Sequence, residues 1–539
     1  MMTNDERMPA MTGVAVVLLF FVLNCAAEDR GELLYNGIRL PAKFPPTDWK
    51  VPQTPELPAY LVKPPELIPI DVGRQLFVDD FLIAETTLQR KYHRATYHPK
   101  TPVLVPDKPW EQMRDGSGMA MAFSDGAWYD PADKLFKMWY MAGQEWTTCY
   151  ATSADGITWD KPNLDVKPGT NIVQTGKRDS STIWLDHQAK DPQKRFKMFR
   201  SCPGGSTVPR TWGLATFFSP DGIHWTEKPL LTGSCGDRST VYFNPFRNVW
   251  VYSLRQGWGQ PRLRRYWEVK DPETGPLWSA GSEAPLWCGA DSADPQRESY
   301  KTPCQLYNLD ATAYESVLLG LFTIWRGQQK DRQKPNEVLV GFSRDGWSWH
   351  RPDRQPFCPI SENFGDWNYA NVQSVGGGCL VVGEQLYFYV SGRGGAKGTN
   401  AEGRRVTGLA TLRRDGFASM EAGETAGTLT TRPLTFKGKH LFVNLDAAQG
   451  ELRVEVVDEK GAVLASSEPL KGNATKLPVK WAGRADLADF SGKPVRFKFT
   501  LRAGALYSFW VSPESSGASF GYVGAGGPGF TGPMDTTGN

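Results

Sequence analysis

One seven-residue pattern, Ser-x-Asp-Gly-x-x-Trp, occurs three times in this chain and constrains its fold more than any other feature. The copies are SADGITW from Ser153, SPDGIHW from Ser219 and SRDGWSW from Ser343. Asp-Gly favours a tight hairpin, because a type I′ turn needs positive φ at both central positions. Catalytic motifs are normally written once, whereas a motif that returns along the chain is typical of a fold built from repeats.

The tryptophans that end these copies set the period of the repeat. Trp159 and Trp225 are 66 residues apart, and Trp225 and Trp349 are 124 apart, or two steps of 62. We assign the missing copy in the longer interval to TGPLWSA around Trp278, and a fifth copy to LATLRRDGFAS at Asp415. The chain is therefore expected to contain five repeats of sixty-odd residues.

Each repeat also carries a turn followed by an aromatic strand. The three clearest copies are YDPADKLFKMWYMAG (129–143), KDPQKRFKMFR (190–200) and FNPFRNVWVYS (243–253). Long segments with a 3.6-residue apolar period are almost absent, which predicts little helix. Five units of strand, turn, aromatic strand and hairpin predict an all-β fold, a five-bladed β-propeller of four-stranded antiparallel sheets.

Changes in composition along the chain predict the remaining segments. Period-two alternation after the last hairpin predicts a C-terminal β-sandwich. The strand RQLFVDDFLIAE (74–85) is expected to close the ring by joining the last blade. The expected segments are a signal peptide (1–27), a Pro-rich N-terminal arm (28–74), the propeller (75–420), the sandwich (424–513) and a Gly-rich disordered tail (514–539).

The first 27 residues predict export. The apolar run MTGVAVVLLFFVL is too short to span a membrane, and the small residues after it favour cleavage after Ala27. Asn24 disfavours lipoprotein processing at Cys25, so we expect a secreted or periplasmic protein without a transmembrane segment. A formal charge of +3 with no basic block argues against nucleic acid as a partner. The chain has no CxxC pair and no His/Cys cluster, which argues against zinc.

Candidate catalytic residues stand where the inner strand of each blade begins, because that strand lines the central channel. Three consecutive blades open with Asp-x-Ser, at Asp115, Asp179 and Asp237. Asp and Ser at a strand entrance often cap turns, which is the structural alternative. The functional interpretation is that these carboxylates converge, since glycoside cleavage needs two carboxyl groups flanking the bond. Glu315, at an inner or second strand of blade four, is a further candidate.

Other polar residues are candidates for contact with a carbohydrate substrate. Arginines in 255–265 could hold an acidic or sulfated sugar, or form a solvated strand face. No cofactor or catalytic metal is expected, and a structural Ca²⁺ in the channel is left open. The candidate substrate-binding residues are Asp79, Asp80, Arg238, Arg255, Gln305, Tyr307, Asn371 and Gln373.

Residues 75–420 resemble the five-bladed propeller glycosidases: arabinanases, invertases, levansucrases and mannoside phosphorylases. HPKTPVLVPDKPWE (98–111) is similar to the phosphorylase branch, and the layout from LFVDDFLI to LRRDGFAS resembles an exported glycosyl hydrolase-like group. The resemblance implies a glycoside hydrolase or phosphorylase with a base or nucleophile, a second Asp and an acid at Asp115, Asp179 and Asp237. The chain lacks NDPNG, RDP and EC dipeptide motifs, and its third-blade acid would be Asp rather than Glu.

Two alternatives remain open at this point. A sialidase has a similar hairpin, one residue longer between Asp and Gly, in a six-bladed ring, and it uses a Tyr/Glu pair such as Tyr314 and Glu315 could form. The other alternative is a non-catalytic carbohydrate-binding or surface scaffold propeller.

Overall fold

The computed structural model describes residues 31–539 apart from 115, 180, 257–260, 275–277, 279, 298, 301, 329–331, 333 and 396–401. The expected signal peptide therefore lies outside the described residues. Strands dominate the described part, whose one α-helix is the short α2 (Ala59–Val62). No helix in this part is long and apolar enough to cross a membrane. The prediction of an all-β fold is confirmed.

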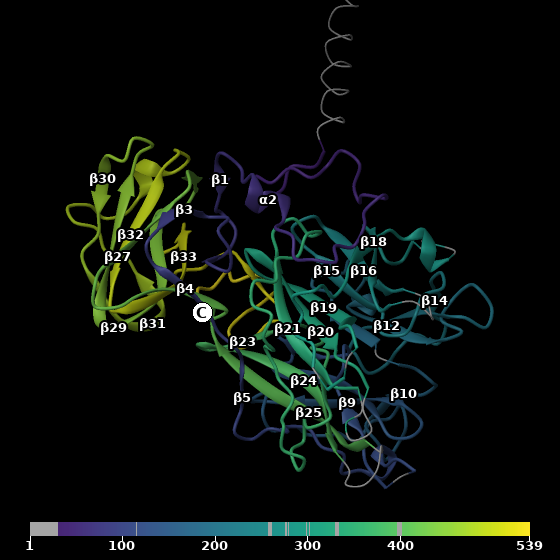
Figure 1. Ribbon diagram of the computed structural model, residues 1–539. Helices are drawn as coiled ribbons and strands as arrows, with labels where there is room; N and C mark the ends of the chain where they lie inside the picture. The colour runs from purple at the N-terminus through teal and green to yellow at the C-terminus, as the bar shows by residue number, and fades with distance from the viewer. Residues whose placement is uncertain are drawn as a thin grey trace, which may run out of the picture.

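Five antiparallel sheets form a propeller of five blades (Figure 1), as predicted. Blade I contains β6 (Ala120–Met121), β7 (Ala127–Asp130), β8 (Leu135–Ala142), β9 (Thr147–Ser153) and β10 (Ile172–Gln174). Blade II contains β11 (Ser181–Leu185), β12 (Phe196–Pro203), β13 (Trp212–Ser219) and β14 (Leu230–Leu231). Blade III contains β15 (Thr240–Asn244), β16 (Val249–Arg255), β17 (Arg264–Val269) and β18 (Leu286–Cys288).

The last two blades depart from the simple pattern. Blade IV contains β19 (Gln305–Glu315), β20 (Val317–Trp325) and β21 (Asn336–Ser343), with Cys358 bridging to Val338 at its outer edge. Blade V contains β22 (Asn371–Gln373), β23 (Leu380–Val382), β24 (Gln385–Gly395), β25 (Glu402–Arg413) and, from the N-terminal side, β5 (Thr96–Tyr97). The pairing of β5 with β25 closes the ring.

The strand expected to close the ring, 74–85, does not do so. It forms β2 (Gln75–Leu76) and β3 (Ile83–Thr86), which pair with sandwich strands. Its side chains alternate between two cores: Phe77 packs in the sandwich core, and Leu76 packs in the cluster of blades IV and V. Apart from β34 (Tyr522–Val523), which joins the sheet of blade IV, the strands of the propeller lie within 96–413, and the segment before them ties the two domains together.

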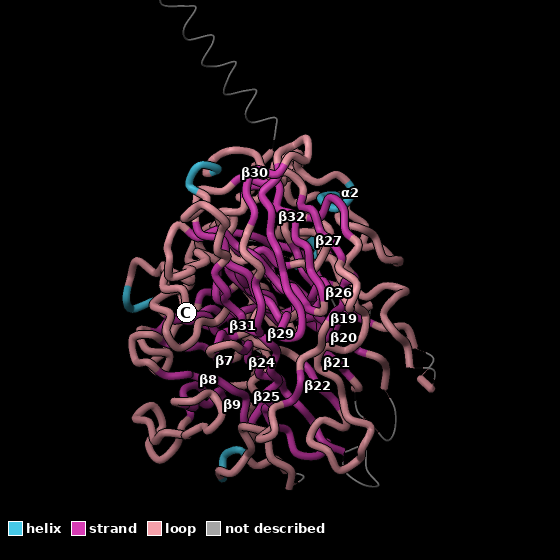
Figure 2. Tube along the Cα trace, turned by 90° about the vertical axis from the view of Figure 1, so that its left-hand side faces the viewer, coloured by secondary structure: helices cyan, strands magenta, loops and turns pink. Residues whose placement is uncertain are grey.

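The sandwich is built on one curved ten-stranded sheet (Figure 2). Its alternating apolar side chains form a core of their own. Its strands, besides β2 and β3, are β4 (Gln89–Tyr92), β26 (Ala418–Ala422), β27 (Gly427–Thr431), β29 (His440–Val457), β30 (Val463–Ser466), β31 (Leu470–Pro478), β32 (Arg496–Arg502) and β33 (Gly504–Ser512). The Pro-rich arm runs over blades III and IV and adds β1 (Ile68–Pro69) parallel to β28 (Leu434–Thr435).

The Gly-rich tail, expected to be disordered, is ordered. Its β34 (Tyr522–Val523) pairs with β19, Tyr129 N donates to Ala525 O at 3.0 Å, and Val381 N donates to Gly526 O at 2.9 Å. Its glycines permit this contact, because a Cβ on Gly527 would lie 1.8 Å from Val381 O. The tail is therefore packed against the inner strands at one end of the channel, and the expectation of disorder is wrong.

The repeated hairpins have a different turn from the expected type I′. In the three Ser-x-Asp-Gly copies only the glycines have positive φ, 74° at Gly156 for example, whereas Asp155 is not in the left-handed region. In the fifth copy the reverse holds, because Asp415 has a φ of 60°. In the first copy, Asp155 Oδ1 accepts hydrogen bonds from the amides of Ile157 (2.8 Å) and Thr158 (2.7 Å). Burial alone would raise the pKa of Asp155, but these bonds lower it to about 2. The repeated Asp is a turn-forming residue.

Candidate functional site

The beginnings of three inner strands meet at one mouth of the channel. Asp179 precedes β11, Arg238 precedes β15, and Tyr307 lies near the start of β19. Arg238 Nε lies 2.6 Å from Asp179 Oδ1, and its guanidinium carbon lies 5.5 Å from the centre of the Tyr307 ring. Blades II, III and IV thus contribute to a single site, which we call the upper mouth.

Both described Asp-x-Ser units place their carboxylate against arginine. The Asp179 side chain is 21% exposed and forms an ion pair with Arg238. Asp237, 15% exposed, forms ion pairs with Arg255 and with Arg262, the latter at 3.7 Å. Asp115, the expected partner from blade I, lies outside the described residues.

The serines of these units are structural. Ser239 Oγ donates to Gly236 O at 2.9 Å and accepts from Arg255 N at 3.0 Å. Ser181 Oγ accepts from Arg178 Nη1 at 2.7 Å. The turn-capping role, which the sequence left open as an alternative, therefore applies to the serines. The aspartates are instead held by ion pairs at the mouth.

Arg238 is the centre of the upper mouth. It is 2% exposed and stacks 4.2 Å from the centre of the Phe123 ring. Burial alone would lower the pKa of Arg238, but Asp179 and Tyr307 raise it, so the guanidinium stays charged. Its φ of 57° lies in the left-handed region, which costs a non-glycine residue about 1–3 kcal/mol. Such strain is typical of positions where a side chain is held for function.

Tyr307 lies among cations. The guanidinium carbon of Arg262 is 4.3 Å from the centre of its ring, and Gln305 Oε1 accepts from Arg262 N at 3.1 Å. Burial alone would raise the pKa of Tyr307, but Arg238, Lys334 and Arg262 together lower it below its usual value. The structure thus brings together four expected binding residues: Arg238, Arg255, Gln305 and Tyr307.

This pKa can be measured by titrating the tyrosines through their near-ultraviolet absorbance. We expect Tyr307 to ionise before the fully buried tyrosines, below the ordinary value of 10.0, because neighbouring cations stabilise the tyrosinate. Tyr307→Phe should remove the earliest part of the curve, and Arg262→Gln should move it to higher pH. Superimposable curves for wild type and Tyr307→Phe below pH 10 would contradict the assignment.

Blade V borders the same mouth through Asn371 and Gln373. Asn371 Nδ2 donates to the carbonyl of Lys334, and Gln373 Oε1 accepts from Asn336 Nδ2 at 3.4 Å. Both expected binding residues are buried. They support the loop that carries Lys334 beside Tyr307.

Three expected site residues lie elsewhere. Glu315 is at the opposite end of β19, fully buried between Arg74 (3.4 Å) and Arg414 (3.3 Å). Asp79 is buried in a bidentate contact with Arg344, and the exposed Asp80 pairs with Arg90. These carboxylates join distant segments, and none of them contacts the upper mouth.

The sialidase alternative is wrong. The ring has five blades, and Tyr314 donates its hydroxyl proton to Asp415 Oδ1 at 2.6 Å in the interior. Tyr314 and Glu315 therefore do not form a nucleophile pair at a channel mouth.

Two interior carboxylates are absent from the list of candidate site residues. Asp125 is fully buried against Arg178, with Oδ2 3.1 Å from Nη2, and Asp310 Oδ2 accepts from Val375 N at 2.9 Å. Burial raises the pKa of both, although Arg178 opposes the shift at Asp125. Asp125 lies in the turn between β6 and β7, whereas Asp310 lies within β19, where an acid in a mostly apolar strand was the available signal. Their contacts indicate that they hold neighbouring inner strands together.

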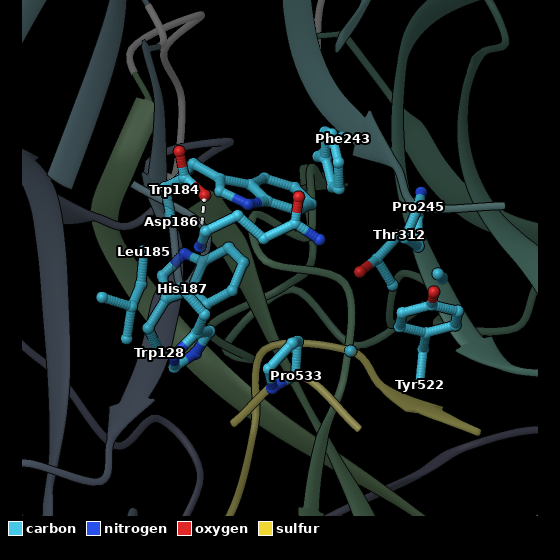
Figure 3. Close-up of a pocket in the computed structure, with 13 residues that line it drawn as sticks. Trp128, Trp184, Leu185, Asp186, His187, Phe243, Pro245, Thr312, Tyr522 and Pro533 are labelled. Atoms are coloured by element: carbon cyan, nitrogen blue, oxygen red, sulfur yellow. Dashed lines mark hydrogen bonds between the residues drawn. The ribbon is translucent and has the colours of Figure 1, made fainter. Parts of the chain in front are cut away.

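The opposite end of the channel holds an aromatic pocket (Figure 3). Trp128 and Trp184 lie on one side of it, with their ring centroids 4.7 Å apart, and Tyr522 of the tail lies on the other. Of the described residues that line it, Asp186 is the only carboxylate, and Lys197 pairs with it at 2.6 Å. This pocket lacks a carboxylate pair, so the upper mouth is the better candidate active site.

Metal binding has no candidate group in the described part of the chain. No three His, Cys, Asp or Glu side chains there are placed to hold an ion. A structural Ca²⁺ remains a prediction.

No protein-family model and no curated protein matches this chain. Several solved structures are similar to it at low identity. They include an N-acetylgalactosamine deacetylase from F. plautii in complex with blood group B trisaccharide (TM-score 0.38, 12% identity, 64% of this chain and 96% of that one). A second is a fructofuranosidase from Schwanniomyces occidentalis complexed with fructose (TM-score 0.34, 12% identity, 75% of this chain and 96% of that one). A third is a glycoside hydrolase family 43 arabinoxylan arabinofuranohydrolase from Bacillus subtilis in complex with cellotetraose (TM-score 0.33, 10% identity, 73% of this chain and 96% of that one). At such low similarity, the activity of this chain has to be inferred from the upper mouth itself.

Proposed function

We propose that the protein is a glycoside hydrolase that cleaves an oligo- or polysaccharide at the upper mouth. The observation that carries the proposal is the pair Asp179 and Asp237, two partly exposed carboxylates on adjacent blades that both lie beside Arg238. Glycoside cleavage needs two such groups, about 5–5.5 Å apart for retention or about 6.5–9.5 Å apart for inversion.

The two aspartates would have different roles. Asp179, which pairs with the buried Arg238, is the proposed base or nucleophile. Asp237 is the proposed second carboxyl group, positioned by Arg255 and Arg262. Asp115 would add a third carboxylate from blade I.

Export is part of the proposal. The leader at residues 1–27 would direct the protein out of the cytoplasm, where polysaccharides too large to enter a cell could reach it.

A non-catalytic binding propeller is the second candidate. It is favoured by the ion pairs themselves, since both described carboxylates of the mouth already contact arginine. On this alternative the mouth would bind a saccharide and leave its glycosidic bonds intact.

A product assay tests the proposal. The protein is incubated with plant and algal oligosaccharides, with and without inorganic phosphate, and new reducing ends and sugar phosphates are measured. We expect new reducing ends without phosphate. Asp237→Glu should lower kcat about 10²-fold, because an added methylene misplaces the carboxyl group by about 1 Å.

Asp165→Glu is the matched control, since Asp165 is an exposed surface aspartate whose side chain is 78% exposed. Saccharides that bind without any bond cleavage would favour the second candidate. Products that form only with phosphate would make the enzyme a phosphorylase.

A further inference from the structure

The described residues of the upper mouth carry more positive than negative charge. The cations are Arg238, Arg255, Arg262 and Lys334, and the carboxylates are Asp179 and Asp237. Asp115, the remaining acid expected there, would still leave an excess of one positive charge. Buried cations without matching anions are costly, so an excess held at a channel mouth indicates an anionic ligand.

Arg238 has donor capacity that the protein does not use. Its Nε contacts Asp179, whereas its Nη1 is buried and has no hydrogen-bond partner. The residue is 2% exposed, and Phe123 and Tyr307 hold its guanidinium plane. A fixed, planar guanidinium with an unused donor fits carboxylate and sulfate oxygens.

Arg262 is the second available cation. Its Nη1 lies 3.7 Å from Asp237 Oδ1, too far for a hydrogen bond, and has no hydrogen-bond partner. The side chain is 18% exposed and lies over Tyr307. Arg262 therefore has a buried donor that no hydrogen bond within the protein uses, on a side chain that is partly exposed at the mouth.

Arg264 adds positive charge behind these two residues. It is fully buried, and its Nη2 donates to Arg238 O at 2.8 Å, while its Nε donates to Ser253 Oγ at 2.9 Å. Burial lowers the pKa of Arg264 to about 10, which still leaves it charged at neutral pH. Its hydrogen-bond partners are neutral oxygens, and the buried Asp310, which acts on the charges of both Arg264 and Arg238, offsets part of the field that Arg264 adds to the mouth.

We propose that the upper mouth binds an anionic sugar residue, whose carboxylate or sulfate group is received by Arg238 and Arg262 beside the ring of Tyr307. This inference rests on the proposed function for the nature of the ligand, a saccharide. It goes beyond that function by specifying that the site selects a negatively charged sugar.

Calorimetric binding of two matched ligand pairs tests it. One pair is an oligogalacturonide and its methyl ester, and the other is a sulfated galactan oligosaccharide and its desulfated form. We expect at least one anionic member to bind about 10- to 100-fold more tightly than its neutral partner, as for hydrogen bonds to charged groups. The pair that shows the preference identifies the group as a carboxylate or a sulfate.

Variants locate the preference. Arg262→Gln should reduce the ratio of the affinities for the anionic and neutral ligands to about twofold or less. Arg262→Lys, which keeps the charge, should retain part of the preference. Arg453→Gln on the sandwich is the control, because its side chain is 54% exposed. For wild type, added salt should weaken only the anionic ligand.

Equal affinities within both pairs, or no binding of either anionic ligand, would overturn the inference. So would an unchanged preference in folded Arg262→Gln. Cleavage is followed in the same samples: anionic ligands that bind intact would refute the hydrolase and support the charge preference. Cleavage of neutral ligands without any anionic preference would support the hydrolase and refute the charge preference.

Discussion

Asp179→Asn should lower kcat about 10²–10⁴-fold, the range expected for loss of a group that acts directly on the reacting bond. The substitution keeps the size of the side chain and removes its charge next to Arg238, which lies 2.6 Å away. A base or nucleophile fails without that charge, whereas a residue that only shapes the mouth would change KM more than kcat. The measurement is kcat and KM on the best oligosaccharide from the product assay.

Stability has to be followed in the same variant. Asp179→Asn leaves the buried Arg238 without a charged partner on that side, so a modest fall in the free energy of unfolding is expected. Kinetics should therefore be measured well below the unfolding transition. Asp165→Asn, at an exposed site, is the control. Wild-type kcat in folded Asp179→Asn would remove Asp179 from the mechanism.

The sequence predicted the ring because its repeats are local. Each hairpin is made by a Ser, an Asp and a Gly within a few residues of each other, as in the bonds from Ile157 and Thr158 to Asp155. Such short-range signals can be counted along a chain. The turn type was wrong because the Asp side chain, rather than a left-handed Asp, satisfies the amides.

The upper mouth could be predicted for a related reason. Asp179 and Asp237 occupy equivalent positions in successive repeats, so the symmetry of the ring brings them together. The arginines that pair with them are not repeated. Arg238 and Arg262 were visible as charges, but their contacts with Tyr307 depend on packing between blades.

Long-range ion pairs explain why Glu315 and Asp79 were wrongly expected at the site. Glu315 and Asp79 resembled site residues because acids are rare in apolar strands. Their partners, Arg74 and Arg344, stand more than 200 residues away in the sequence. Nothing local distinguishes a carboxylate that faces a ligand from one that joins two domains.

Arg74→Met should lower the free energy of unfolding by about 3–5 kcal/mol, the cost of leaving buried charges without their partner. Arg74 is fully buried, with Nη1 3.1 Å from Asp415 Oδ2 and Nε 3.4 Å from Glu315 Oε1. It also donates to Thr475 O at 2.8 Å and lies over Trp510. One side chain therefore connects the propeller and the sandwich.

The loss should depend on pH with a definite sign. Burial alone raises the pKa of Asp415, but Arg74 and Arg414 bring it below its usual value. Without Arg74, the buried carboxylates favour protonation, and the folded variant binds more protons than the unfolded chain. Its stability then falls as pH rises. The difference from wild type should shrink when the pH is lowered from about 8 to about 5.

Denaturant titrations of wild type and Arg74→Met at both pH values measure this effect. Arg453→Met is the control, because its exposed pair with Glu451 at 3.7 Å should contribute about 1 kcal/mol or less. Adding Glu315→Gln and Asp415→Asn to Arg74→Met should recover part of the loss, since the uncompensated charges are then gone. An unfolding midpoint equal to that of wild type at pH 8 would show that the domains do not depend on this junction, and a loss that grows at lower pH would refute its electrostatic origin.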